Sequence, residues 1–187
     1  KSSYYLYWGG YFQKSRYLTI LKKSKVFMTI CSSLIEKFYN DGRKIIFVAE
    51  RIKLLEELFR KFSKFPDKSI FIAGSKLDEI EKQLTFTTPQ KSRDGVDYVS
   101  KDCMIITSPI GNIDQMSGRA LRVAPNKKQP LLIDMVDINV REIKKTFFSR
   151  LSFYKSKNWS VKYLFVGSDG SKRTVDEQEA INIIKDE

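Results

Sequence analysis

The chain has 187 residues, of which 42% are hydrophobic and 30% are charged. This composition is typical of a folded chain, and the length fits one domain with a small appendage. The sequence contains no histidine, which excludes histidine-based catalysis and most zinc sites. The two cysteines, Cys31 and Cys103, are far apart and lack metal-ligand spacing, so we expect no metal site and a reducing, cytoplasmic compartment.

Positive charge is in excess, with 34 lysines and arginines against 22 aspartates and glutamates and a net charge of +12. Such a chain attracts polyanions, because their binding releases condensed counterions. Together with the many aromatic residues, the charge predicts a nucleic-acid partner; the alternative is a lysine-rich surface that only aids solubility. No apolar run approaches the ~18 residues of a membrane span, so no membrane partner is expected. Because residue 1 is Lys rather than Met, we expect a piece of a longer protein.

Residues 1–23 are aromatic and basic and are interrupted by Gly9-Gly10, which predicts a linker or a segment from a missing upstream domain. A helix with an apolar face from Phe27 to Phe38 is expected next. Short apolar runs typical of buried parallel strands then alternate with helical patterns. The strands are expected at 45–49, 70–73, 84–88, 103–107 and 131–136, and the helices at 54–62, 77–83, 113–121 and 139–156. This alternation predicts an α/β fold, a parallel sheet with helices on both faces.

The last part of the chain has a different pattern. Residues 161–166 alternate like a strand, a turn is expected at 168–170, and Thr174 and Glu177 have capping-box spacing for a last helix. Basic and aromatic residues interleave over 141–173, where packing of a small extension is favoured and stacking on bases is the alternative. The expected domains are the segment 1–23, an α/β lobe at 24–140 and a helical and hairpin extension at 141–187.

The strongest local signal is the run from Gln115 to Arg122, which reads Gln-Met-Ser-Gly-Arg-Ala-Leu-Arg. Arg119 and Arg122 are three residues apart, so on a helix they point the same way. Gly118 lets a phosphate or another backbone come close. Paired guanidinium groups are suited to clamp the oxygens of a phosphoryl group during its transfer. The alternative interpretation is an amphipathic helix with solvated arginines.

A second signal runs from Thr87 to Asp97, just past the third expected strand. Ligands of open parallel sheets bind at the carboxyl ends of strands, where hydroxyls such as that of Thr88 and exposed amides suit phosphate oxygens. The Asp97 carboxylate is suited to accept hydrogen bonds from a ribose hydroxyl or an arginine. The alternative is an ordinary polar loop that turns at Asp94-Gly95.

In this order, the two signals resemble motifs V and VI of superfamily 2 helicases. The Q-x-x-G-R-x-x-R pattern of motif VI is matched by Gln115, Gly118, Arg119 and Arg122. Motif V centres on G-x-D, which Gly95 and Asp97 match. The run 44–49 resembles motif IV, and Gly74 resembles the glycine between motifs IV and V. The resemblance covers about residues 24–137 and implies a C-terminal RecA-like lobe.

The resemblance also implies roles for these residues. In that family, the two arginines of motif VI are arginine fingers that reach ATP held by the other lobe. Carried over, Arg119 and Arg122 are the catalytic residues, and Gln115 and Gly118 lie beside the nucleotide.

Motif V contacts both the nucleotide and the nucleic-acid backbone in that family. This implies Gly95 and Asp97 for the nucleotide and Thr88 for the backbone, although Pro89 stands where a hydroxyl is often found. Three residues that follow expected strand ends complete the nucleic-acid-binding set: Arg51, Gly74 and Lys76. For Arg51 and Lys76, a solvated surface charge is the stronger interpretation.

The sequence has no G-x-x-x-x-G-K-[S/T] loop to cradle the β- and γ-phosphates of ATP. Asp78-Glu79 echoes a magnesium-binding motif, but it lies on an expected short helix, so we interpret it as surface charge. The resemblance therefore implies that ATP and Mg²⁺ bind mainly to a missing N-terminal RecA-like lobe of the same parent chain. This fragment alone is expected to be inactive as an ATP hydrolase.

The expected function is the second motor lobe of an ATP-dependent helicase or translocase that acts on DNA. The basic, aromatic C-terminal end resembles phage helicases of the UvsW type, which remodel branched DNA; a phage protein would act in the host cytoplasm. Two alternatives stay open. One is a basic nucleic-acid-binding module without motor function, and the other is a lobe of an RNA helicase.

Overall fold

The computed structural model describes residues 6–93, 98–107, 109–125 and 127–186. The chain forms two compact units, Leu18–Met135 and a second unit made of Lys1–Tyr17 together with Val136–Glu187. Each unit is described by itself below. Among the described residues, no helix is both long and apolar enough to cross a bilayer.

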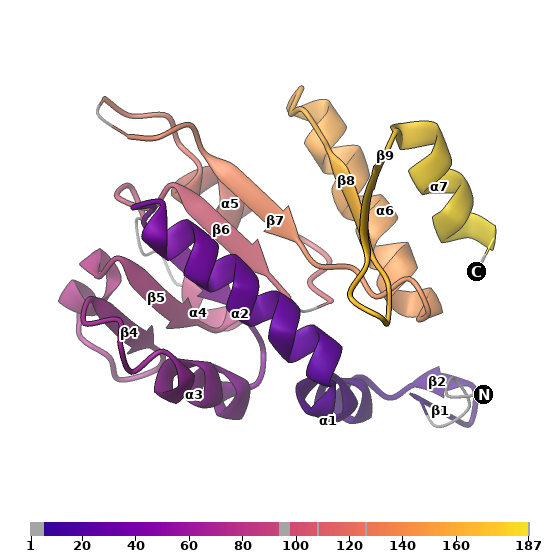
Figure 1. Ribbon diagram of the computed structural model, residues 1–187, viewed down its shortest axis with the longest axis horizontal. Helices are drawn as coiled ribbons and strands as arrows, with labels where there is room; N and C mark the ends of the chain where they lie inside the picture. Colours follow the sequence, from indigo (N-terminus) through magenta and orange to yellow (C-terminus); the bar gives the residue numbers. More distant parts are fainter. Residues whose placement is uncertain (1–5, 94–97, 108, 126, 187) are drawn as a thin grey trace. The chain divides into compact units, whose positions relative to one another are not determined.

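The larger unit is built on a five-stranded sheet in which every neighbouring pair is parallel. Its strands are β3 (Ile45–Val48), β4 (Lys68–Phe71), β5 (Leu84–Thr87), β6 (Cys103–Ile106) and β7 (Leu131–Asp134). They lie in the order β4-β5-β3-β6-β7 (Figure 1). All residues of β3, β5 and β6 are buried, and the unbroken apolar runs of β3 and β6 are typical of strands covered on both faces. The α/β fold expected from the sequence is confirmed.

Two helices cover one face of this sheet, α2 (Lys25–Asn40) and α3 (Ile52–Lys61). Ser24 caps α2, because its side-chain oxygen accepts a hydrogen bond from the Phe27 amide at 3.3 Å. The buried side of each helix joins alternate residues of the strands in one hydrophobic core, which includes Ile35, Leu55 and Phe47. Each such fully buried side chain contributes about 1.5–3 kcal/mol.

The opposite face of the sheet carries α4 (Pro89–Arg93) and α5 (Asp114–Ala120). In Figure 1 these two helices lie behind the sheet, whereas α2 and α3 lie in front of it. They pack against one another, and the Ser92 hydroxyl lies 2.9 Å from the Met116 sulfur. The expected strands and helices of this unit are present, with their ends shifted by one or two residues.

One expectation for the larger unit is sharpened and another is wrong in detail. Residues 77–83 were expected to form a short helix, and Leu77–Glu81 forms the 3-10 helix η2. The segment after β5 was expected to be a polar loop, but it begins with α4. Thr88 precedes this helix and Pro89 opens it, and proline at a first helical position loses no hydrogen bond because that amide has no partner inside the helix.

The smaller unit contains a hairpin, β1 (Tyr7–Trp8) with β2 (Tyr11–Phe12), followed by the start of α1 (Lys14–Lys23). It also contains α6 (Arg141–Ser156), a second hairpin of β8 (Tyr163–Val166) with β9 (Lys172–Val175), and α7 (Glu177–Asp186). The expected cap at Thr174 is wrong, because Thr174 lies in β9 and pairs with Leu164. Asp176 caps α7 instead, and its carboxylate accepts a hydrogen bond from the Glu179 amide at 2.8 Å.

The aromatic residues of the extension mostly pack, as the sequence favoured. Phe147, Leu151 and Tyr154 are buried along α6. The Tyr154 ring stacks on Trp159 with centroids 5.8 Å apart. The basic side chains of this segment lie largely on its surface, but Arg150 is buried within α6.

Candidate functional site

The carboxyl ends of parallel strands meet at one edge of the sheet, and this edge collects four of the expected site residues. Arg51 follows β3, Gly74 and Lys76 follow β4, and Thr88 follows β5. The chain leaves β3 toward β4 but leaves β6 toward β7, so the connections diverge between β3 and β6. Ligands of open α/β sheets bind outside the strand ends at such a point.

The outer face of α5 presents the first half of the Q-x-x-G-R-x-x-R run. Gln115 and Gly118 are exposed, whereas Met116 and Ser117 between them are buried. The Ser117 hydroxyl donates to the Ile113 carbonyl at 2.8 Å, so this buried hydroxyl has its partner within its own helix. A side-chain carbon added at Gly118 would meet no atom of the described residues within 4 Å beyond its own helix backbone and chain neighbours. This face is therefore open to a second body.

Of the two arginines of this run, one lies on the expected helix and the other does not. Arg119 is inside α5, and its side chain falls outside the described part of the chain. Arg122 lies beyond this helix, which is capped at Leu121, whose amide donates to the Ser117 carbonyl at 2.8 Å. The idea that one helix aligns both arginines is therefore wrong for Arg122.

Arg122 lies in the connection that leads to the amino end of β7, and its side chain is exposed. Its backbone carbonyl accepts a hydrogen bond from the Lys127 ammonium at 2.8 Å. The position of Arg122 is thus held through its backbone, which leaves the guanidinium at the surface of the connection.

The Thr88 hydroxyl, expected to contact a phosphate, has a partner within the chain. It accepts a hydrogen bond from the Lys91 amide at 3.3 Å, and the Thr88 carbonyl accepts one from the Ser92 amide at 3.0 Å. Thr88 therefore caps α4, the helix that packs on α5. The two expected motif segments thus meet, although Gly95 and Asp97 lie outside the described residues.

The remaining expected contact residues lie at the carboxyl edge of the sheet. Lys76 is exposed, and the half-buried Arg51 lies with a terminal guanidinium nitrogen 3.4 Å from the Thr19 hydroxyl oxygen. Gly74 adopts φ +84°, a left-handed conformation that favours glycine. The Ser75 hydroxyl accepts from the Ile72 amide at 3.0 Å and fixes this turn. The edge therefore offers cationic side chains and backbone groups on a rigid scaffold.

Asp78 and Glu79 lie on η2 and form no metal centre in the structure. Within the described ranges, no group of three acidic, cysteine or histidine side chains is placed to hold a metal ion. The Glu79 carbonyl is used by the Ser69 hydroxyl, which donates to it at 2.5 Å.

The amino edge of the same sheet holds charged groups that sequence reasoning did not single out. A terminal nitrogen of Arg43 lies 3.2 Å from the Asp102 carboxylate and donates to the Gln129 carbonyl at 3.0 Å. The Lys101 side chain is fully buried, and its ammonium donates to the Thr85 hydroxyl at 2.8 Å and to the Lys82 carbonyl. Burial lowers the pKa of Lys101 to about 7.

The sequence matches no family model. It is 23% identical over 141 residues to an Acanthamoeba polyphaga mimivirus protein that is named as an ATP-dependent RNA helicase on the basis of prediction. That match covers 71% of this chain and 27% of the mimivirus protein, so the chain spans about a quarter of that relative.

The fold is similar to the crystal structure of the C-terminal part of the Fun30 ATPase domain, with a TM-score of 0.51 and 14% identity. The likeness covers 88% of this chain and 54% of that chain. Together, the two comparisons show that the fold is like that of the C-terminal part of an ATPase domain and that the sequence is distantly similar to a protein named as a helicase. They do not support the narrower likeness to phage helicases of the UvsW type.

Proposed function

We propose that this chain is the second lobe of a two-lobe, ATP-driven superfamily 2 motor that translocates on or remodels DNA. The observation that carries this proposal is the open outer face of α5. It presents Gln115 and Gly118 to a second body, and it lies beside the helix that Thr88 begins. A solvated amphipathic helix needs no glycine in the middle of its exposed face, where glycine costs about 1 kcal/mol relative to alanine.

The residues of α5 and the following connection fit a nucleotide held by another lobe. The partner lobe contributes the P-loop, which this sequence lacks, and bound Mg²⁺-ATP supplies the phosphoryl group that is transferred to water. Gln115 and Gly118 approach the nucleotide, and closure of the lobes brings Arg119 and Arg122 to the γ-phosphate oxygens. Gly95 and Asp97, which follow α4 in the sequence, contact the nucleotide as well.

The carboxyl edge of the sheet provides the track for the nucleic-acid backbone. Arg51 and Lys76 neutralise phosphates of the nucleic acid there, and Gly74 and Thr88 bring backbone amides close to the same nucleic-acid strand. The net charge of +12 supports a polyanionic partner. Because phosphate contacts release counterions, binding weakens steeply as salt rises.

A second candidate substrate is RNA, which the name of the mimivirus relative favours. Unwinding assays on matched DNA and RNA duplexes distinguish the two, and a branched DNA tests the remodelling activity. Faster unwinding of DNA supports the proposal, and unwinding confined to RNA replaces DNA as the substrate.

The proposed function predicts that this chain alone does not hydrolyse ATP, with or without nucleic acid. A two-lobe protein, in which the chain is joined to its P-loop lobe, should hydrolyse ATP and turn over faster when DNA is added. The measurement is steady-state phosphate release from both proteins at equal concentration. Turnover that stays with the isolated chain through several independent separations contradicts the proposal.

A further inference from the structure

The hairpin of β1 and β2 has one packed face and one bare face. Tyr7 pairs with Phe12 across the strands, and their rings lie with centroids 5.9 Å apart. The Phe12 ring then contacts Tyr17, which is buried at the start of α1, with centroids 5.8 Å apart. The neighbouring cross-strand pair, Trp8 with Tyr11, points to the other face because side chains alternate along a strand.

Both side chains of this second pair are strongly exposed, Trp8 at 76% and Tyr11 at 78%. Single exposed apolar side chains are common on protein surfaces, but two large exposed aromatic side chains on one face of a hairpin are costly to leave in water. No described part of the chain covers this pair.

The hairpin has a defined turn and hydrogen bonds that fix it within its own unit. Gly9 and Gly10 have φ of +55° and +83°, which fits the tight two-residue turn that matches the twist of a hairpin. The Gln13 amide donates to the Leu6 carbonyl at 2.7 Å and closes the hairpin base. The Tyr7 hydroxyl donates to Glu142 on α6, and burial together with this hydrogen bond raises the pKa of Tyr7 to about 12.

The segment of the sequence that carries this hairpin is basic. The first acidic residue of the chain is Glu36, and six basic residues precede it, of which Lys1, Lys14 and Arg16 belong to the same compact unit as the hairpin. Two acidic groups of this unit interact with the packed face: Asp137 with Tyr17, and Glu142 with Tyr7. The Glu142 carboxylate also lies 3.7 Å from the Nε of Arg141. A basic segment that carries exposed aromatic rings is the arrangement that binds single-stranded nucleic acid, with bases stacked on the rings and cations near the phosphates.

We propose that Trp8 and Tyr11 form a stacking surface for the bases of single-stranded nucleic acid. The inference rests on the proposed function for its nucleic-acid partner, but it adds a contact that is separate from the carboxyl edge of the sheet. Every base has a ring face, so this contact does not discriminate between sequences. The Trp8 and Tyr11 pair would contact bases, whereas the proposed contacts of Arg51 and Lys76 are with phosphates.

The test uses Trp8 as its own reporter. Trp159→Phe leaves Trp8 as the only tryptophan of the chain. Titration with an oligothymidine of about 8 nucleotides should quench Trp8 fluorescence, because a stacked base contacts the ring. An abasic strand with the same number of phosphates should bind more weakly and leave the fluorescence nearly unchanged.

Variants then measure the contribution of each ring. Trp8→Ala and Tyr11→Ala should each weaken oligothymidine binding by about tenfold, and Trp8→Phe should stay close to wild type because it keeps a ring. Leu164→Ala is the matched control, since it removes another exposed apolar side chain, at 57% exposure, from the second hairpin. All four variants should melt at the wild-type temperature because the altered side chains are exposed.

Three outcomes overturn the inference. One is equal quenching by the abasic strand, and another is unchanged affinity in both alanine variants; in either case nucleic-acid binding by the carboxyl edge still stands. The third is that Trp8 in the two-lobe protein without DNA is shielded from acrylamide, because a protein segment then covers this face. ATP turnover by the two-lobe protein is measured separately, so failure here leaves the motor proposal intact.

Discussion

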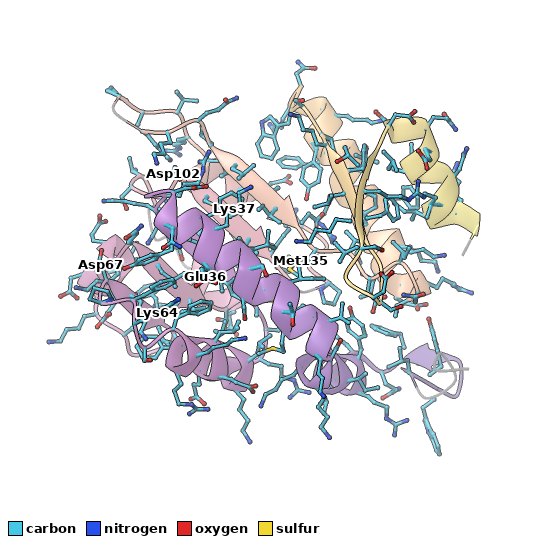
Figure 2. All side chains as sticks on the ribbon, viewed as in Figure 1. Glu36, Lys37, Lys64, Asp67, Asp102 and Met135 are labelled. Carbon is cyan, nitrogen blue, oxygen red and sulfur yellow. The ribbon has the colours of Figure 1, made fainter. Side chains whose placement is uncertain are left out.

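The two edges of the five-stranded sheet differ in whether their polar side chains are paired within the chain or exposed. At the amino edge, charged side chains are paired inside the chain: Arg43 with Asp102, and the buried Lys101 with Thr85. Figure 2 labels Asp67 and Asp102 on this side, where each precedes a strand. At the carboxyl edge and on the outer face of α5, by contrast, Lys76, Gln115 and Gly118 are exposed. Internal pairing at the amino edge stabilises the fold, and exposure at the carboxyl edge provides groups for a partner.

The largest effect should be a loss of ATP turnover when Arg119 or Arg122 is replaced. In the two-lobe protein, Arg119→Ala or Arg122→Ala should lower ATP turnover by about 10³, because a guanidinium stabilises charge on the transferring phosphoryl group. Arg→Lys at either position should recover little of the loss, because lysine lacks the planar fork of donors. The measurement is steady-state turnover at saturating ATP and DNA. Full recovery with lysine would indicate a simple positive charge in place of a finger.

The amino edge should respond in stability instead. Arg43→Ala leaves the Asp102 carboxylate, whose side chain is only 7% exposed, without its cationic partner. We expect a loss of about 2–3 kcal/mol in the free energy of unfolding, somewhat below the cost of breaking a fully buried pair. Urea unfolding followed by circular dichroism measures this loss.

Lys64→Ala is the matched control for that prediction. It breaks the ion pair of Lys64, which follows α3, with Glu36, which lies on α2; Figure 2 labels both residues. The Lys64 side chain is 65% exposed and that of Glu36 is 46% exposed. Exposed pairs contribute about 0–1 kcal/mol, so the two variants should differ clearly. Equal losses would mean that the amino edge has no special role in stability.

Lys101 should give the smallest effect, a slope of stability with pH. Its pKa is about 7 in the folded chain and 10.5 in the unfolded chain, so the unfolded state binds more protons between these values. The free energy of unfolding therefore rises with pH in this window, by at most about 1.4 kcal/mol per pH unit, and this gain is lost as pH falls toward 7. Glu81, Asp67 and Asp102 oppose the lowered pKa and Lys44 adds to it, but burial is the main cause.

Lys101→Met should flatten this slope. Unfolding is best measured between about pH 7 and about pH 8.5. The chain has no histidine that would titrate near this window, and titration of the buried thiols changes the stability only at higher pH. Burial raises the pKa of Cys31 and Cys103, which lowers stability as pH rises above their usual range. An unchanged slope in Lys101→Met would show that another group is responsible.

Most of the α/β framework could be predicted from the sequence because buried parallel strands have unbroken apolar runs. The runs at Ile45–Val48 and Cys103–Ile106 were found within one residue at each end. The strand order could not be predicted, since it depends on which runs pair across the chain. The short helix after Thr88 had a readable signal, a capping hydroxyl followed by proline, but a helix this short has no clear periodicity.

The candidate site was predicted by motif, and its environment was not. Spacing identified Gln115 and Gly118, and only the structure shows that both lie on the outer face of α5. A buried lysine such as Lys101 has no local signature, because lysine is normally exposed and its burial depends on tertiary packing. The Trp8 and Tyr11 pair did have a signal, Gly-Gly between aromatic residues, which is typical of a tight hairpin.

The proposed division of roles, catalysis after the open face of α5 and stability at the amino edge, is tested by measuring ATP turnover and unfolding free energy on the same two variants of the two-lobe protein, Arg119→Ala and Arg43→Ala. Arg119→Ala should lose about 10³ in turnover and keep wild-type stability, because the proposed role of this side chain is toward the nucleotide of the other lobe. Arg43→Ala should lose about 2–3 kcal/mol of stability and, well below its melting temperature, keep turnover within about twofold of wild type. Turnover within about twofold of wild type in Arg119→Ala would contradict the assignment of this chain as the lobe that supplies the arginine finger.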